Sequence, residues 1–173
     1  VCDFDTHSLC FWTQAQGDTF DWTRQTGTTP SSGTGPTSGD GGSGYYMFIE
    51  TSSPRGSGDD ASLVSTGMGC GLAFSYNMYG ASTGSLTIAT SSVSVNGPWA
   101  TDWTLAGDQG MAWKTKTVRW SASSYVKITG VAGYDYTGDI AIDTTSILVC
   151  QPTPAPTKAP TPQPTPAPTP VPT

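Results

Sequence analysis

The sequence predicts an all-β domain, a jelly-roll sandwich of two antiparallel sheets, and three observations support this class. Some ten short segments alternate apolar and polar residues with a period of two, and no segment keeps a helical period. Turn residues separate these segments, and charged residues make up only 12% of the chain. Short strands at regular spacing with turns between them are typical of sandwiches and jelly rolls.

The amino-terminal part begins with two short strands and then a long loop. Phe4, Phe20 and Trp22 are expected to anchor these strands in the core. Residues 26–43 contain only Gly, Thr, Ser and Pro besides one acid, Asp40, and they have no hydrophobic pattern. Loops of this length are uncommon in compact domains and are often functional or mobile.

The middle of the chain has the clearest strand signals. Residues 44–50 and 61–65 are rich in β formers, and residues 84–90 alternate in polarity. The stretch CGLAFSYNMYG, residues 70–80, predicts a core strand because its large side chains recur at every second position. Cys70 has the same parity as these apolar side chains, so its sulfur is expected to point inward.

The last third of the domain predicts three further strands. Residues 116–120 and 125–129 are expected to pair with each other across a turn at 121–124. Residues 138–150 form the final strand, in which Ile140 and Ile142 face the core. On this parity three residues face outward: Asp139, Ala141 and Asp143.

Composition changes abruptly at Cys150, which divides the chain into a domain at 1–150 and a tail at 151–173. The tail contains ten Pro, and Thr recurs at every fourth residue. Proline fixes φ and removes hydrogen-bond donors, so a polyproline II tail is predicted. Thr with Pro indicates an O-glycosylated stalk, and a bare semi-rigid linker is the alternative. The expected glycosylation sites are Thr153, Thr157, Thr161, Thr165, Thr169 and Thr173.

The net charge of −6 limits the classes of partner. Excess negative charge repels nucleic acid and anionic lipid, so no nucleic-acid partner is expected. No apolar run approaches the length of a membrane span. Twelve of the thirteen acids are Asp, which serves either as a turn residue or as a ligand for hard cations. Because the chain begins with Val1, we expect a mature, processed chain.

Four cysteines, Cys2, Cys10, Cys70 and Cys150, indicate two disulfides in an oxidising compartment. A zinc site is not expected, because the chain has no C-x-x-C motif and only one histidine. Spacing favours a bond between the two close cysteines, which leaves the other two to pair. Three pairings are nevertheless possible in principle.

Several segments resemble, in the same order, the pattern of the MAM domain family. They read CDFD, CFWTQ, DTFDWTR, GYYMFIETS, CGLAFSYNMYGASTGSLTI, QGMAW and GDIAIDTTSI before the last cysteine. The resemblance covers residues 1–150 and does not extend to the tail. It implies a jelly-roll sandwich with bridges Cys2–Cys10 and Cys70–Cys150, found in extracellular adhesion and assembly proteins without catalytic activity.

The resemblance also implies a structural metal ion, usually calcium, near the joined ends of the first and last strands. The matching positions are Asp5, Asp40 and Asp143. Asp5 stands where the family usually has Glu, and Asp40 is all that remains of a usual Asp-His-Thr. Asp139 shares a face with Asp143, but the two are about 13 Å apart at strand rise, so only one can bind the ion.

Catalytic constellations are absent from the sequence, and we do not expect an enzyme. His7 is the only histidine, and it lies in the loop between the first two cysteines. A Ser-His-Asp or Cys-His device would need that residue as its base, and the cysteines are expected to be oxidised. No phosphate-binding loop occurs, and nothing marks two acids as a glycosidase pair.

The leading hypothesis is a secreted adhesion or structural protein whose domain makes protein–protein contacts and whose rigid tail spaces it. Contacts between tails and neighbouring domains would be heterologous and would permit a homopolymeric fibre or filament. One alternative is a calcium-dependent carbohydrate-binding module that contacts glycan through Trp103, Tyr134 and Tyr136. Packing is the competing role for these aromatic residues. The other alternative is an accessory domain of a larger secreted protein, with the tail as linker.

Overall fold

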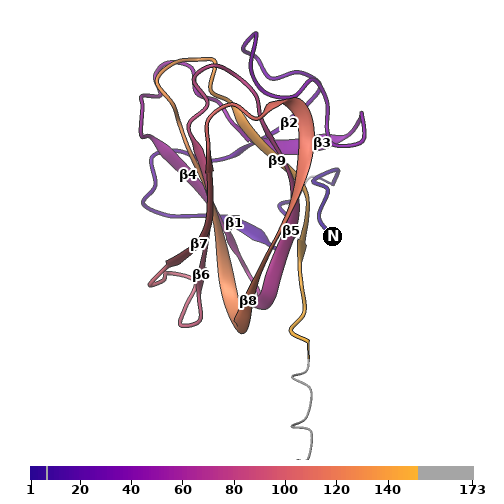
Figure 1. Cartoon of the computed structure of the whole chain (residues 1–173), viewed down its shortest axis with the longest axis vertical. Coiled ribbons are helices and arrows are strands. Elements are labelled where there is room, and N and C mark those ends of the chain that lie inside the picture. The colour runs from indigo at the N-terminus through magenta and orange to yellow at the C-terminus, as the bar shows by residue number, and fades with distance from the viewer. Residues whose placement is uncertain (7, 152–173) are drawn as a thin grey trace, which may run out of the picture.

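The computed structural model describes residues 1–6 and 8–151, and its fold is all-β (Figure 1). The predicted polyproline II tail and the six predicted O-glycosylation sites lie outside the described residues, as does His7. The strands are β1 (Trp12–Gln14), β2 (Thr23–Thr26), β3 (Tyr45–Ile49), β4 (Asp60–Ser65), β5 (Gly69–Met78), β6 (Ser85–Ser91), β7 (Ala100–Ala106), β8 (Gly110–Val131) and β9 (Ile140–Ile147).

The strands form two antiparallel layers, which confirms the predicted sandwich. One layer has the order β1, β4, carboxyl-terminal half of β8, β6, β7. The other has the order amino-terminal half of β8, β5, β9, β3, β2. We call them the β4 sheet and the β5 sheet. Figure 1 shows the two layers meeting at the bend of β8.

The prediction that residues 116–120 pair with residues 125–129 is wrong. Both segments belong to the single strand β8, which is 22 residues long. Its first half pairs with β5, for example Val118 with Leu72. Its second half pairs with β4 and β6, for example Ile128 with Leu63 and Ile88. Residues 121–124 therefore carry the chain from one sheet to the other instead of folding it back on itself.

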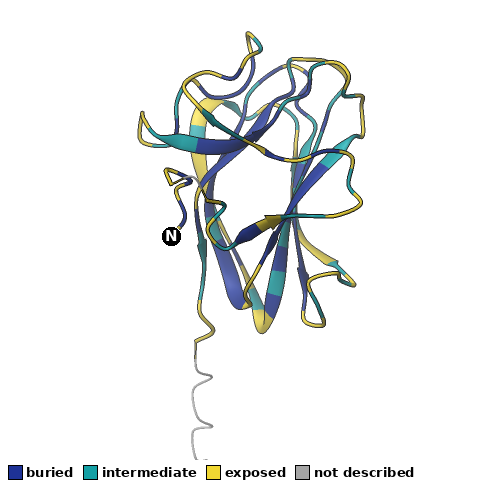
Figure 2. Ribbon diagram, turned by 180° about the vertical axis from the view of Figure 1, so that it is seen from behind, coloured by how far each residue is buried: buried dark blue, intermediate teal, exposed yellow. Residues whose placement is uncertain are grey.

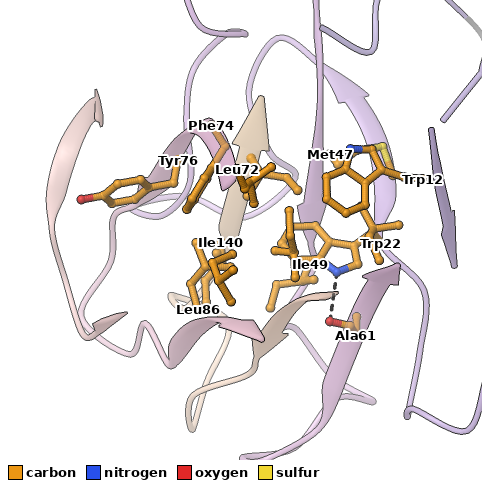
Figure 3. Packing of buried hydrophobic residues seen from close by; sticks show 14 of the residues in the cluster. Trp12, Trp22, Met47, Ile49, Ala61, Leu72, Phe74, Tyr76, Leu86 and Ile140 are labelled. Atoms are coloured by element: carbon orange, nitrogen blue, oxygen red, sulfur yellow. Dashed lines mark hydrogen bonds between the residues drawn. The ribbon is translucent and has the colours of Figure 1, made fainter. Parts of the chain in front are cut away.

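The core lies between the sheets, and alternating residues of most strands contribute to it (Figure 2). The alternating side chains of β5 are all buried here, as predicted: Leu72, Phe74, Tyr76 and Met78. Phe4, Phe20 and Trp22 are also buried. The indole N–H of Trp22 donates a 2.9 Å hydrogen bond to the Ala61 carbonyl, which satisfies the polar atom of this large side chain (Figure 3).

The opposite face of the β5 sheet is also covered, by the long loop at 27–44. Tyr46, Phe48 and Ala141 form a second small buried cluster on this face, against which Trp113 packs. The Tyr46 hydroxyl donates to the Gly27 carbonyl at 2.8 Å, and the Trp113 indole donates to the Ser38 carbonyl at 2.9 Å. These bonds hold the loop against the sheet although it has no hydrophobic pattern of its own.

The covering loop corrects the expectation that the last strand has a solvent-facing side. Asp139, Ala141 and Asp143 do lie on the face opposite Ile140 and Ile142, as parity predicts. All three are nevertheless buried, with exposed fractions of 0%, 0% and 3%. Two carboxylates therefore lie in a layer between the sheet and the loop, where charge is costly unless it is compensated.

Two disulfides join Cys2 to Cys10 and Cys70 to Cys150, the pairing that the resemblance implies. Cys2 also exchanges two backbone hydrogen bonds of 2.7 Å with Thr145, so the amino terminus lies beside β9. The second bridge links the start of β5 to the residue from which the tail departs. Both ends of the domain are thus attached to the β5 sheet.

Candidate cation site and ligand surfaces

Two of the predicted metal ligands, Asp40 and Asp143, are brought into direct contact by the covering loop. The backbone N–H of Asp40 donates to Oδ2 of Asp143 at 2.9 Å. The Asp40 carboxylate in turn accepts a 2.5 Å hydrogen bond from Ser75 Oγ on β5. Asp143 lies opposite Ser75 in the register of β5 and β9, so both carboxylates rest on the same patch of sheet.

The third predicted ligand, Asp5, lies against the last residue of the same loop, a few residues after Asp40. Its Oδ1 accepts the backbone N–H of Tyr45 at 2.7 Å, and its backbone carbonyl accepts from Arg24 Nη2 at 2.9 Å. Gly44 allows this approach, because a Cβ atom there would lie 2.5 Å from Asp5 Oδ1 and its φ is +84°. The shorter Asp side chain thus replaces the family's usual Glu in a tightly fitted position.

Asp143 is 3% exposed and lies beneath the covering loop. Burial is the main cause that raises its pKa to about 6, and the charges of Asp40 and Asp5 raise it further. Hydrogen bonds from the backbone of Asp40 and Thr144 oppose the rise. The groups that act on Asp143 through their charge are both acidic, so a bound cation would lower the energy of all three carboxylates.

The donor chemistry fits a hard cation, but the side chains alone do not enclose one. Within residues 1–6 and 8–151, no three His, Cys, Asp or Glu side chains are close enough to hold a metal ion between them. Calcium takes about six to eight oxygen ligands, which include backbone carbonyls and water as well as carboxylates. The three aspartates could therefore supply only part of such a site.

A second carboxylate pair, which the sequence interpretation did not single out, lies at the far end of the same covered face. Oδ2 of Asp139 and Oε2 of Glu50 are buried and lack a hydrogen-bond partner among the described residues. Their other oxygens accept from adjacent amides, the Thr51 N–H at 3.1 Å and the Ser52 N–H at 3.0 Å. Burial and then the charge of Glu50 raise the pKa of Asp139 to about 6.

The aromatic residues proposed to contact glycan differ in their surroundings. Trp103 is half-buried and packs against Phe74 and Tyr76, with ring centroids 5.8 and 5.9 Å apart, so it belongs to the edge of the core. Tyr134 and Tyr136 lie in the loop before β9 and are 73% and 53% exposed. The loop thus offers two tyrosine rings to a ligand, and glycan contact stays a prediction.

A family model for the MAM domain (meprin/A5/mu) matches residues 2–152. The chain belongs to the MAM family. Human MAM domain-containing glycosylphosphatidylinositol anchor protein 1 is 40% identical over 160 residues, which cover 85% of this chain and 17% of that protein. Mouse MAM domain-containing glycosylphosphatidylinositol anchor protein 2 is 33% identical over 170 residues, which cover 84% of this chain and 18% of that protein. This MAM chain therefore spans under a fifth of the length of these relatives.

Solved structures share the fold of this MAM domain at low sequence identity. The K1 cleaved adhesin domain of Lys-gingipain from Porphyromonas gingivalis superposes with a TM-score of 0.61 at 17% identity, over 86% of this chain and 96% of that one. A carbohydrate-binding module specific for non-crystalline cellulose, CBM28, gives 0.52 at 12% identity, over 85% and 92%. Among the described residues, no helix is long and apolar enough to cross a membrane.

Proposed function

We propose that this MAM domain is a secreted, non-enzymatic adhesion or structural module that acts through protein–protein contacts. The observation that supports this best is the match of the MAM model to nearly the whole domain, together with a fold closed by two disulfides. Disulfides of this kind persist in oxidising, extracytoplasmic environments. Relatives whose names describe a glycosylphosphatidylinositol anchor support a place at the cell surface or in the extracellular matrix.

The tail gives the proposal its second part. Ten prolines and a Thr at every fourth position suit an O-glycosylated, extended spacer between the MAM domain and its surroundings. We propose that the domains associate through it into a homopolymeric fibre. Contacts between unlike surfaces of identical chains do not close on themselves, so they can extend without limit.

A structural calcium ion at Asp5, Asp40 and Asp143 completes the proposal. These aspartates lie at or against the carboxyl-terminal end of the covering loop, and the repulsion among them disfavours the ionised state of Asp143. A cation bound there would fix the loop to β9 and to the amino terminus. The role would be stabilisation of the fold, without a part in any reaction.

Two measurements on the natural protein test the proposal. Intact mass before and after removal of O-linked sugar shows whether the tail is modified. Sedimentation over a wide range of protein concentration shows whether chains associate. Mass heterogeneity that collapses on deglycosylation, with concentration-dependent growth of the particles, would support it. An unmodified chain that stays monomeric at the highest concentration would contradict both the stalk and the fibre.

The second candidate function is calcium-dependent carbohydrate binding. It is favoured by the two exposed tyrosines beside β9, since exposed aromatic rings stack on sugars, and by the shared fold with CBM28. Glycan-array binding that is lost with a chelator and with Tyr134→Ala would support it. A third possibility, an accessory domain within a longer secreted protein, is compatible with the small share of the relatives' length that this chain spans.

A further inference from the structure

A groove of about 330 Å³ lies on the outer surface of the β4 sheet, away from the covered face. Its floor is a row of residues from three neighbouring strands, Thr13 on β1, Val64 on β4 and Lys127 on β8. This row alternates with core residues such as Leu63 and Ile128, so it faces away from the core. Two loops form the walls, one at residues 15–16 and the other at 95–99.

Trp99 is the largest side chain of the groove, and its position is fixed by its neighbours. Gly97, with φ of +91°, lies under the ring, since a Cβ atom there would be 2.8 Å from the indole. The Lys127 ammonium stands 5.2 Å from the ring centroid, within the range of a cation–π contact. The indole is held half-buried at the wall, with part of its surface open to solvent.

The groove also contains hydrogen-bond donors that the fold does not use. Gln16 and Asn96 are exposed, and within the described part of the chain their side-chain amides have no hydrogen-bond partner. The same holds for the N–H of the Trp99 indole. Apolar contact is supplied between these donors by Val64 and by Val95, which is 42% exposed. An aromatic ring, apolar side chains and several unused donors thus line one groove.

Those features match the chemistry of a polyproline II segment. Its backbone carbonyls have no internal partner and need donors, while its proline rings pack on aromatic faces. The segment is extended before it binds, so little conformational entropy is lost on docking. The chain itself contains such a sequence, the Thr-Pro repeat at 152–173.

We propose that the Trp99 groove binds the Thr-Pro segment of a neighbouring copy of this chain. The inference rests on the proposed assembly and gives it a docking site. The segment begins next to Cys150, which is bonded to Cys70 on the β5 sheet, whereas the groove lies on the β4 sheet. At about 3.1 Å per residue the segment would extend roughly 70 Å, well beyond a domain of this size.

The test uses the full chain, made without O-glycans, in sedimentation experiments over a range of concentrations. Trp99→Ala should weaken self-association about tenfold or more, because a central aromatic anchor is lost. Gln16→Ala should weaken it less, and it is a milder change to the fold. The matched control is Val93→Ala in the same β6–β7 loop, where Val93 is 72% exposed but does not line the groove, and it should leave association unchanged.

Competition identifies the occupant. A synthetic peptide of residues 151–173 should dissociate the assemblies and change the fluorescence of the wild-type chain more than that of Trp99→Ala. The same peptide with its prolines replaced by alanine should do neither. Assembly that is equally strong in Trp99→Ala and Gln16→Ala would overturn the groove while leaving the proposed assembly in place. Displacement by oligosaccharides but not by the peptide would also overturn it, in favour of a sugar site.

Discussion

Glu50 and Asp139 stand directly opposite each other at the end of the β3–β9 ladder. Ile49 is paired with Ile140, and the two acids are the next residues along each strand. Cross-strand neighbours at this position have Cβ atoms about 5 Å apart, and like charges there are destabilising. Each acid has one buried oxygen without a partner among the described residues, and one shared proton would satisfy both.

This arrangement predicts that the domain loses stability as the pH rises through the pKa of Asp139. Its pKa is raised to about 6 from 3.8, so between these values the folded state binds more protons than the unfolded state. The stabilisation is therefore full below about pH 4 and is lost above about pH 6. Asp139→Asn should remove the part of this dependence that Asp139 causes and raise the free energy of unfolding at pH 7.5 by roughly 2 to 4 kcal/mol, while Asp143, whose pKa is also raised to about 6, keeps its own part.

Urea unfolding from pH 4 to pH 8 measures the effect. Asp21→Asn is the matched control, because Asp21 is exposed and its carboxylate accepts no hydrogen bond from the described residues. Glu50→Gln should flatten the pH profile only in part, because it removes the repulsion but leaves burial, the larger cause of the raised pKa of Asp139. A pH profile in both variants that is as steep as that of the wild-type chain would show that the two carboxylates do not share a proton.

Calcium should stabilise the domain through Asp143 and not through Asp139. At a free concentration one hundred times the dissociation constant, a ligand that binds only the folded state adds about 2.7 kcal/mol. Asp143→Asn should abolish this gain, and Asp139→Asn should keep it. Because the pKa of Asp143 is about 6 without a cation, affinity should fall as the pH drops below 6, when protons compete for the carboxylate.

Thermal unfolding with calcium or with chelator, at pH 7.5 and at pH 5, measures both effects. Magnesium is the control cation and should stabilise the domain less than calcium does. The smaller magnesium ion requires a stricter coordination geometry than loop oxygens supply. A melting temperature that is insensitive to chelator at pH 7.5 would rule out a structural calcium ion in this MAM domain.

Trp113→Phe should loosen the loop at 27–44 without unfolding the domain. The change removes the 2.9 Å hydrogen bond to the Ser38 carbonyl and weakens the edge-to-face packing on Tyr46, whose ring centroid is 5.9 Å away. The free energy that holds the loop against the sheet should fall by about 1 to 2 kcal/mol. Hydrogen exchange should become faster in residues 28–44, while β4 and β6 in the other sheet stay protected. Uniform acceleration in both sheets would contradict this local role.

The two disulfides should contribute unequally. The Cys70–Cys150 bridge spans a sequence separation of 80, and Cys2–Cys10 spans only 8. Because each bridge lowers the entropy of the unfolded chain, the long bridge should stabilise the fold by about 4.5 kcal/mol and the short one by about 2.5 kcal/mol. Replacing each pair by alanine and measuring urea unfolding tests the order. A larger loss for the Cys2–Cys10 pair would mean that its contacts with β9 outweigh loop closure.

Alternation along single strands was enough to predict the sandwich and its core. Every second residue of β5 is large and apolar, and this local signal does not depend on the partner strand. Pairing is a different matter, since it depends on residues far apart. Ser121 to Ser124 have the composition of a turn, yet Ser124 pairs with Gly69 beside a bulge, so the strand continues through them.

The candidate sites, too, could be predicted where the signal is local and not where it depends on residues far apart in the sequence. Parity placed Asp139 and Asp143 on one face but could not show that the face is covered, because the covering loop is held by hydrogen bonds rather than by apolar side chains. The resemblance identified three aspartates, of which Asp40 and Asp143 are in contact. The Trp99 groove had no local signal, since its floor joins residues 13, 64 and 127 through sheet register alone.

The continuous strand β8 has a mechanical consequence. Its first half is the edge strand of the β5 sheet, beside β5, and its second half lies between β4 and β6, so both sheets share a single length of backbone. A force applied at the tail enters β5 through Cys70 and passes directly into β8. Neither sheet can be peeled away while the other stays intact, and the MAM domain should yield to stretching in one step.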